Sequence, residues 1–224
     1  MSRALIVGVG VGLSASFARL LAREGYELAL AARDTAKLAN LAAETRATTH
    51  ACDAADPDSV AALFQAVPDA SVVLYNPSYR IRGALTQLDP AEVRRTLEVT
   101  AFGAFLVAQQ AARAMLAADG GTILLTGASA GVKGYAQSAP FAMGKFALRG
   151  LAQSMARELH PQGIHVVHVV VDGGIRAAGR PVPADKPDSL LDPDAIAQTM
   201  LDVLAQPRSC WTDEIAVRPW VERF

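Results

Sequence analysis

A strand, a glycine-rich turn and the start of a helix follow one another in Ala4-Leu-Ile-Val-Gly8-Val-Gly10-Val-Gly12-Leu13-Ser14. The apolar residues before Gly8 predict a buried strand, and the glycines predict a tight turn into a helix. Such a turn brings bare backbone N–H groups, at the positive end of the helix, against the pyrophosphate of a dinucleotide. We therefore predict a nucleotide site at Gly8, Gly10, Gly12 and Leu13, with a glycine turn that binds no ligand as the alternative.

Short apolar runs and stretches of helical period alternate along the rest of the chain, as in repeated strand–helix units around a buried parallel sheet. The expected strands are 4–7, 27–32, 48–51, 71–75, 122–126, 164–171 and 214–217. The expected helices are 13–24, 36–43, 57–65, 90–118, 140–159 and 193–205. We predict one doubly wound α/β domain of Rossmann type over residues 1–224, with a mainly seven-stranded parallel sheet. The polar, proline-rich stretch 179–193 is expected to be a mobile loop.

The composition is that of a globular protein, because 51% of the residues are hydrophobic and 19% are charged. A formal net charge of -1 argues against a nucleic-acid-binding surface or a polybasic membrane anchor. The two cysteines, Cys52 and Cys210, lie far apart, which predicts neither a disulfide framework nor a zinc site. We expect a cytoplasmic protein whose partners are a small molecule and copies of itself, with no nucleic acid and no membrane.

The residues after the second and third expected strands point to the adenosine end of a dinucleotide. Arg33 follows the second strand, the place from which a side chain reaches the adenosine ribose. A guanidinium there suits a 2′-phosphate through paired charge-assisted hydrogen bonds, so NADP is favoured and NAD stays possible. Asp53, after the third strand, is placed to touch the adenine. A solvated Arg33 and a turn-forming Asp53 are the alternatives.

From Ala4 to its end, the chain resembles the short-chain dehydrogenase/reductase family. The glycine motif of that family corresponds to Gly8, Gly12 and Ser14, with serine at the third glycine. The family's Asn-Asn-Ala-Gly segment corresponds to Tyr75-Asn76-Pro77-Ser78.

The resemblance also places Asp172-Gly173 at the family's Pro-Gly after the sixth strand. It implies that Asn76, Gly173 and Ile175 contact the cofactor. It further implies a homodimer or homotetramer built by the two long helices 90–118 and 140–159. The wall of the substrate pocket is then expected within 174–191.

Active members of this family use a serine, a tyrosine, a lysine and usually an asparagine. The tyrosine hydroxyl gives a proton to the substrate carbonyl oxygen as hydride from the nicotinamide reaches the carbon. In this chain Lys145 keeps the lysine position, where it would hold the nicotinamide ribose. A solvated lysine on the surface of the helix is the alternative. Phe141 stands at the tyrosine position, Ala128 at the serine position and Thr100 at the asparagine position. Loss of such an acid costs about 10²- to 10⁴-fold in rate.

Several hydroxyl groups are candidate substitutes for the missing acid. Ser129 follows the serine position, and Ser138 precedes Phe141 at the place where enoyl reductases of the family carry a tyrosine. Tyr79 and Tyr135 are expected in loops that border the same cleft. A serine is a poor acid unless water or another group assists it, and turn or capping roles are the ordinary interpretation of both serines.

Three histidines gather near the sixth expected strand, at His160, His165 and His168. His165 and His168 point to opposite faces of a strand, so we do not expect them to bind a metal.

Two functions fit these residues equally. The first is an NADP-dependent oxidoreductase with an atypical site, because hydride transfer needs only a positioned nicotinamide and an electrophilic carbon. The second is an NADP-binding sensor or scaffold without turnover, which the loss of two hydroxyl groups favours. No residue in the sequence identifies the substrate.

Overall fold

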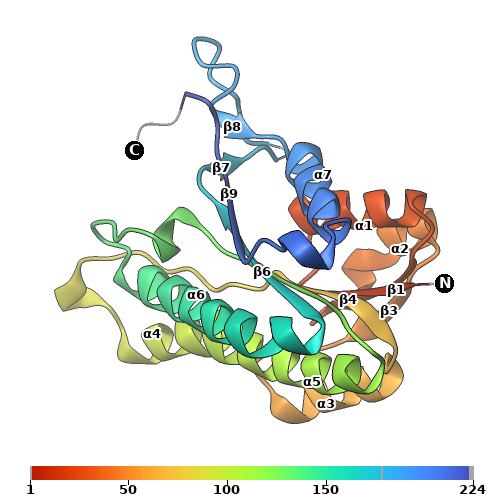
Figure 1. Ribbon diagram of the computed structural model, residues 1–224. Helices are drawn as coiled ribbons and strands as arrows, with labels where there is room; N and C mark the ends of the chain where they lie inside the picture. The colour runs from red at the N-terminus through yellow and green to blue at the C-terminus, as the bar shows by residue number, and fades with distance from the viewer. Residues whose placement is uncertain (1, 178, 222–224) are drawn as a thin grey trace.

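A seven-stranded sheet forms the centre of the computed structural model, which describes residues 2–177 and 179–221 (Figure 1). The strands are β1 (Arg3–Val7), β2 (Glu27–Ala32), β3 (Thr48–Ala51), β4 (Ala70–Tyr75), β5 (Gly121–Thr126), β6 (Ile164–Val171) and β9 (Glu214–Val217). They lie in the order β3-β2-β1-β4-β5-β6-β9, and all neighbours are parallel. The chain changes direction across the sheet between β1 and β4. The doubly wound α/β prediction is confirmed.

Helices cover both faces of this sheet (Figure 1). One face carries α3 (Pro57–Ala66), α4 (Pro90–Leu97), α5 (Gly103–Ala117) and α6 (Ala139–Leu159), and the other carries α1 (Leu13–Arg23), α2 (Ala39–Thr45) and α7 (Pro193–Leu204). Side chains alternate along β1, so Leu5 and Val7 pack against the first group while Ala4 and Ile6 pack against the second. A strand buried on both faces must be apolar throughout, which is why the first strand reads as an unbroken apolar run.

Two of the expected helices begin or continue differently from the prediction. The stretch expected as helix 36–43 opens with a 3₁₀ turn (Thr35–Leu38), because the Asp34 carboxylate accepts a 3.1 Å hydrogen bond from the Ala36 N–H and starts a tighter turn. The stretch expected as helix 90–118 is interrupted between α4 and α5 by a π-helical turn (Glu98–Phe102). Such turns locally widen a helix and re-aim its side chains.

The segment expected as a mobile loop, 179–193, contains ordered structure at its end. Leu190–Leu191 forms β8, which pairs in parallel with β7 (Gly174–Ile175). This short pair joins the segment to the chain that leaves β6, so the expectation of a loop throughout 179–193 is wrong.

The helical stretch from Pro90 to Ala117 is, within the described part of the chain, long and apolar enough to cross a membrane by length and composition alone. Its inner side packs against β4, α3 and α6. Phe102, Phe105 and Leu116 remain exposed on its outer side. The apolar composition thus divides between a core face and an outer face that another protein surface can cover.

Candidate functional site

Two neighbouring cavities open at the carboxyl ends of the strands, where the connections that follow β1 and β4 lead to opposite faces of the sheet. The first cavity, of about 820 Å³, is lined by the ends of β1, β2 and β3 and by α4. The second cavity, of about 600 Å³, is lined by the ends of β5 and β6, the start of α6 and the segment after β6. Asn76 and Ser78 line both cavities. This is the crevice in which open α/β sheets bind their ligands.

The glycine turn closes one end of the first cavity. Gly8 has a φ of +80° and donates its N–H to the Ala31 carbonyl at 2.9 Å. A Cβ at Gly8 would lie 2.5 Å from Cγ of Pro77, so only glycine fits there. A Cβ at Gly10 or Gly12 would meet nothing within 4 Å. The space outside these two glycines is therefore open to a ligand, and the turn fits a phosphate group.

The helix that follows the turn begins at Leu13. The Leu13 side chain is buried in the core, so only its backbone faces the turn. Ser14, at the third glycine of the family motif, is 1% exposed, and its hydroxyl accepts the Gly10 N–H at 2.9 Å. The serine thus satisfies one amide of the turn from within the protein and holds the turn against the helix.

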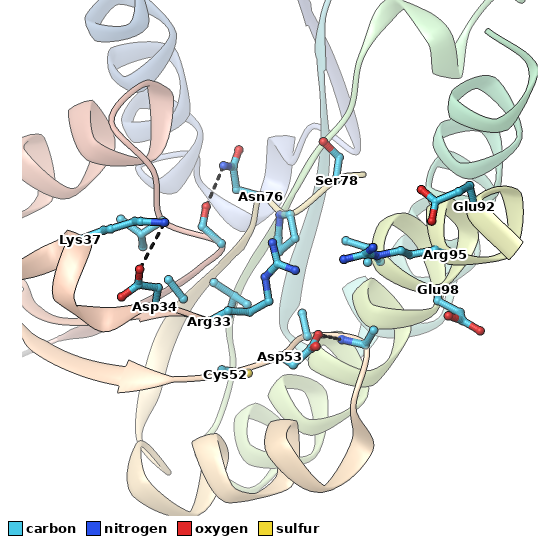
Figure 2. Close-up of a pocket in the computed structure, with 18 of the residues that line it drawn as sticks. Arg33, Asp34, Lys37, Cys52, Asp53, Asn76, Ser78, Glu92, Arg95 and Glu98 are labelled. Carbon is cyan, nitrogen blue, oxygen red and sulfur yellow. Dashed lines mark hydrogen bonds and ion pairs between the residues drawn. The ribbon is translucent and has the colours of Figure 1, made fainter. Parts of the chain in front are cut away.

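Three cationic side chains are among the residues that line the first cavity. Arg33 lines this cavity from the end of β2, and it makes no ion pair with any carboxylate of the described residues. Figure 2 shows its guanidinium extending into the cavity, whereas Lys37 turns toward Asp34, 3.2 Å away. Arg95 of α4 lines the same cavity and lies over the Tyr79 ring, 4.6 Å from its centre.

Asp53 and Asn76 also line the first cavity. The Asp53 carboxylate accepts the Ala55 N–H at 3.0 Å, which is the turn role weighed as the alternative, and the residue still faces the cavity (Figure 2). Asn76 donates its side-chain N–H to the Gly8 carbonyl at 3.1 Å. This bond joins the segment after β4 to the glycine turn.

Lys145 lies at the base of the second cavity with 2% of its surface exposed. Its Nζ donates to the Thr126 carbonyl at 2.7 Å. Burial lowers the pKa of the Lys145 ammonium to about 8. The alternative of a solvated lysine is therefore wrong, because the charge is held inside the protein at the end of β5.

Phe141 lines the same cavity one helical turn before Lys145. Its ring is contacted by two cations: the guanidinium carbon of Arg80 lies 4.9 Å from the ring centre and Nζ of Lys145 lies 5.8 Å from it. Negative potential on the face of an aromatic ring favours such contacts. The ring at the tyrosine position is thus a surface for positive charge.

Ala128 and Thr100, which the family resemblance places at the serine and asparagine positions, lie in different surroundings. Ala128 and Ser129 line the second cavity, and Ser129 begins a 3₁₀ turn (Ser129–Gly131). Thr100, in the π-helical turn, is fully buried and does not line either of the two cavities. Its hydroxyl accepts the Tyr79 N–H at 3.3 Å, and its Cβ would lie 3.0 Å from a Cβ at Gly144. Thr100 therefore packs against the helix that carries Lys145.

Two buried hydroxyl groups in the second cavity have no hydrogen-bond partner among the described residues. They belong to Ser138, which is 2% exposed, and to Thr126, which is 9% exposed. Ser138 precedes α6, but its hydroxyl makes no cap bond, so the capping role expected for its side chain is wrong. A buried hydroxyl without a partner is uncommon and costs stability. Both residues line the second cavity, although the hydroxyl oxygens themselves are buried in its wall.

Of the remaining candidates, Tyr79 alone lines neither of the two cavities. Tyr135 lines the second cavity, whereas the Tyr79 hydroxyl turns away and donates to Glu92 at 2.5 Å. Gly173 and Ile175 line the second cavity from the segment after β6. The side chain of Tyr79 does not line either of the two cavities, which corrects the expectation for that tyrosine.

The histidines of β6 serve the packing of the sheet. His165 donates its Nε2–H to the Thr212 carbonyl at 2.8 Å, and its ring stacks on Trp211. His168 lies on the opposite face, with Nδ1 2.9 Å from the Glu214 carboxylate. In the described ranges, no group of three or more His, Cys, Asp or Glu side chains is arranged to hold a metal ion.

Comparison with known proteins identifies the architecture that surrounds these cavities. Residues 2–180 match the short chain dehydrogenase family. The chain belongs to this family. Within it, an uncharacterized oxidoreductase of Staphylococcus aureus (strain N315) is 27% identical over 226 residues, covering 96% of each chain.

Solved short-chain dehydrogenase structures share the whole fold. One from Rhodopseudomonas palustris has a TM-score of 0.85 at 30% identity and covers 98% of this chain and 99% of its own. A metagenomic short-chain oxidoreductase in complex with NADP has a TM-score of 0.84 at 28% identity, with 98% of each chain covered. The likeness to the family inferred from the sequence is confirmed.

Sequence reasoning missed several residues that line the two cavities. They are Lys37 and Arg95 in the first cavity, and Arg80, Arg82, Thr126 and Arg180 in the second. Arg80, Arg82 and Arg180 lie in loops, where no periodicity reports which way a side chain points. Thr126 ends a strand and was counted only as part of it, although the carboxyl end of a strand is where such folds place their functional groups.

Proposed function

We propose that this protein binds NADP(H) along the two cavities and acts as an oxidoreductase whose proton donor is not a tyrosine. The buried Lys145 ammonium carries this proposal, because it lies in the second cavity with a pKa of about 8 and a single hydrogen bond to the protein. Placing an unpaired charge there costs stability. In a site that binds a nucleotide and donates a proton, the Lys145 ammonium would have a functional role.

The residues present fit the proposed cofactor. Open space at Gly10 and Gly12 accommodates a pyrophosphate, and Arg33 is unpaired for a 2′-phosphate. Asn76, Gly173 and Ile175 line the route from the glycine turn to Lys145. When bound, the nicotinamide supplies or accepts a hydride.

The proton of the reaction is then held by the protein. In carbonyl reduction, the hydride forms the new C–H bond and the carbonyl oxygen takes a proton. An acid whose pKa lies near the working pH is effective in this role, and the Lys145 ammonium has such a pKa. The hydroxyl groups of Thr126 and Ser138 would position the oxygen or a relaying water.

A second candidate function is an NADP-binding sensor or scaffold without turnover. The identities of Phe141 and Ala128 favour it, because neither side chain can donate a proton or hold a carbonyl oxygen.

Assembly of copies of the chain belongs to the same proposal. Phe102, Phe105, Met143 and Phe146 are each between 41% and 50% exposed on the helices of one face of the sheet. Exposed apolar side chains gathered on one face mark an interaction surface. A homodimer or homotetramer would cover them.

Fluorescence titration with NADPH and NADH tests the binding step. A screen of ketones, enones, imines and alcohols, followed by NADPH absorbance, tests turnover. We expect tighter binding of NADPH than of NADH and turnover that Lys145→Met abolishes. Failure to bind either nucleotide overturns the proposal, and binding without turnover in any class leaves the sensor function.

A further inference from the structure

We propose that the second cavity binds the anionic end of a small substrate, a carboxylate or a phosphate group, between Arg80, Arg82 and Arg180. This inference deepens the proposed function, since it assigns the ligand class of the same cleft. It rests on the charges, contacts and unpartnered groups of the cavity wall.

The wall of the second cavity carries positive charge only. Arg80, Arg82, Lys145 and Arg180 line it, and none of its lining residues is an aspartate or a glutamate. None of the three arginines forms an ion pair with a carboxylate in the part of the chain that the structure describes. All three arginines are exposed residues that line the same cavity. Here the positive potential is concentrated in a concave site, which attracts an anion.

The arginines approach the cavity from two different segments. Arg80 and Arg82 lie in the segment between β4 and α4, close enough that the charge of Arg82, together with burial, lowers the pKa of Arg80. Arg180 lies between β7 and β8 on the other side of the cavity. Two segments distant in sequence therefore bring positive charges to one cavity. These charges repel one another, and an anion bound between them would reduce the repulsion.

Local contacts hold two of these guanidinium groups in place. The Phe141 ring supports Arg80, with 4.9 Å between the guanidinium carbon and the ring centre. A Cβ at Gly174 would lie 2.8 Å from Cζ of Arg180, so the absence of a side chain lets the guanidinium lie against the backbone. Arg180 also donates to the Ile175 carbonyl at 3.4 Å. A guanidinium positioned in this way offers its remaining N–H groups to a carboxylate or a phosphate.

A second, independent observation points to a ligand in the same place. The Ser138 hydroxyl is buried in the wall of this cavity and has no partner among the described residues. A hydroxyl can donate to an anionic oxygen or to the carbonyl of the same molecule. A cavity of about 600 Å³ accommodates a small metabolite rather than a polymer.

Isothermal titration of the protein saturated with NADP⁺ tests the inference, because the oxidised cofactor permits no reduction during the measurement. Acetoacetate is compared with its methyl ester, and glycerol phosphate with glycerol, so that each anion has a neutral partner. The variants are Arg80→Gln, Arg82→Gln and Arg180→Gln. Arg23→Gln, an exposed arginine in the last turn of α1, removes the same charge at a distance and serves as the control.

We expect at least one anion to bind about tenfold or more tightly than its neutral partner, and each cavity variant to weaken it by about ten- to a hundredfold. Arg23→Gln should leave the affinity unchanged. Stronger acetoacetate binding identifies a carboxylate ligand, and stronger glycerol phosphate binding identifies a phosphate. Equal binding of both members of each pair, or anion binding that no cavity variant alters, overturns the inference.

Two controls separate this result from the proposed function. NADP⁺ affinity is measured for every variant, and a loss confined to that affinity assigns the arginines to the cofactor and overturns the inference. If the protein binds no nucleotide, the proposed function fails, and the same anion titrations on the protein alone still test the arginines. Among the described residues, Arg82 makes no side-chain hydrogen bond or ion pair that its replacement would break, so Arg82→Gln tests the cavity even if another variant fails to fold.

Discussion

The guanidinium carbon of Arg80 lies 4.9 Å from the centre of the Phe141 ring, and Nζ of Lys145 lies 5.8 Å from the same centre. One ring thus contacts two cations at the position where active relatives place a tyrosine. Phenylalanine keeps the electron-rich face of the ring and lacks the ionisable hydroxyl group. At the position where the family resemblance predicts a tyrosine, this chain presents a ring that contacts positive charge and has no proton to donate.

Restoring the family's hydroxyl groups should restore its chemistry. We expect Phe141→Tyr combined with Ala128→Ser to raise NADPH-dependent reduction of carbonyl compounds by about 10²- to 10⁴-fold, because the lysine is already in the cavity. NADPH oxidation followed by absorbance measures the change, with Phe141→Leu as the control. A folded double variant that binds NADPH and shows no gain would contradict the proposed geometry.

Arg33 should determine the preference for NADPH over NADH. Its guanidinium lines the first cavity without a carboxylate partner, so Arg33→Gln should weaken NADPH binding by about ten- to a hundredfold. NADH lacks the 2′-phosphate, and its affinity should stay within about twofold. Fluorescence titration measures both, and Arg23→Gln is the matched control. An equal loss for both nucleotides would remove Arg33 from the phosphate site.

Lys145 should lower the stability of the protein near neutral pH. Its pKa is about 8 in the folded protein against 10.5 for a free lysine, so between these values the unfolded chain holds more protons and stability rises with pH. The interval corresponds to about 3 kcal/mol, part of which the bond to Thr126 offsets. Lys145→Met should therefore raise the free energy of unfolding near pH 7 by about 1–3 kcal/mol. Urea denaturation measures it.

The higher free energy of unfolding expected for Lys145→Met should disappear toward high pH. Above the unfolded pKa both proteins are uncharged at this position, so the two unfolding free energies converge. Unfolding curves recorded near pH 7 and near pH 10 test this sign. A constant difference across that range would mean that burial does not lower the pKa of Lys145.

Ser138 should contribute to ligand binding rather than to folding. Because its buried hydroxyl has no partner in the described chain, Ser138→Ala should leave the free energy of unfolding unchanged or raise it by about 1 kcal/mol. The affinity of the anion that the second cavity prefers should fall severalfold. Thermal denaturation and titration measure the two effects, with Ser154→Ala, at an exposed serine of α6 that lines neither of the two cavities, as the control. A loss of stability with unchanged affinity would restore the capping interpretation.

The exposed aromatic face should hold copies of the chain together. Phe146 is 45% exposed on α6, and a charge there would be buried on assembly, so Phe146→Glu should shift the protein toward monomer. Light scattering after size exclusion measures the mass. Leu85→Glu, at an apolar side chain that is 78% exposed outside these helices, is the control. A wild-type monomer, or an assembly that Phe146→Glu does not alter, would contradict the prediction.

Local sequence was sufficient for most of the fold. The expected strands at 27–32, 48–51, 164–171 and 214–217 coincide with β2, β3, β6 and β9. Apolar runs of strand length between helical stretches leave few alternatives to a parallel sheet. The π-helical turn near Thr100 was not predicted, because it continues a helical pattern without a break in the sequence.

The sequence by itself also showed that the expected tyrosine and serine hydroxyl groups are missing, since the identities of Phe141 and Ala128 can be read without any structure. Only the tertiary structure decided what stands in their place. Arg80 and Arg180 are 100 positions apart in the chain and line one cavity. The orphaned hydroxyl of Ser138 likewise depends on which groups surround it. Secondary structure follows from neighbours along the chain, whereas charge convergence and unpaired hydrogen bonds depend on how distant segments are brought together.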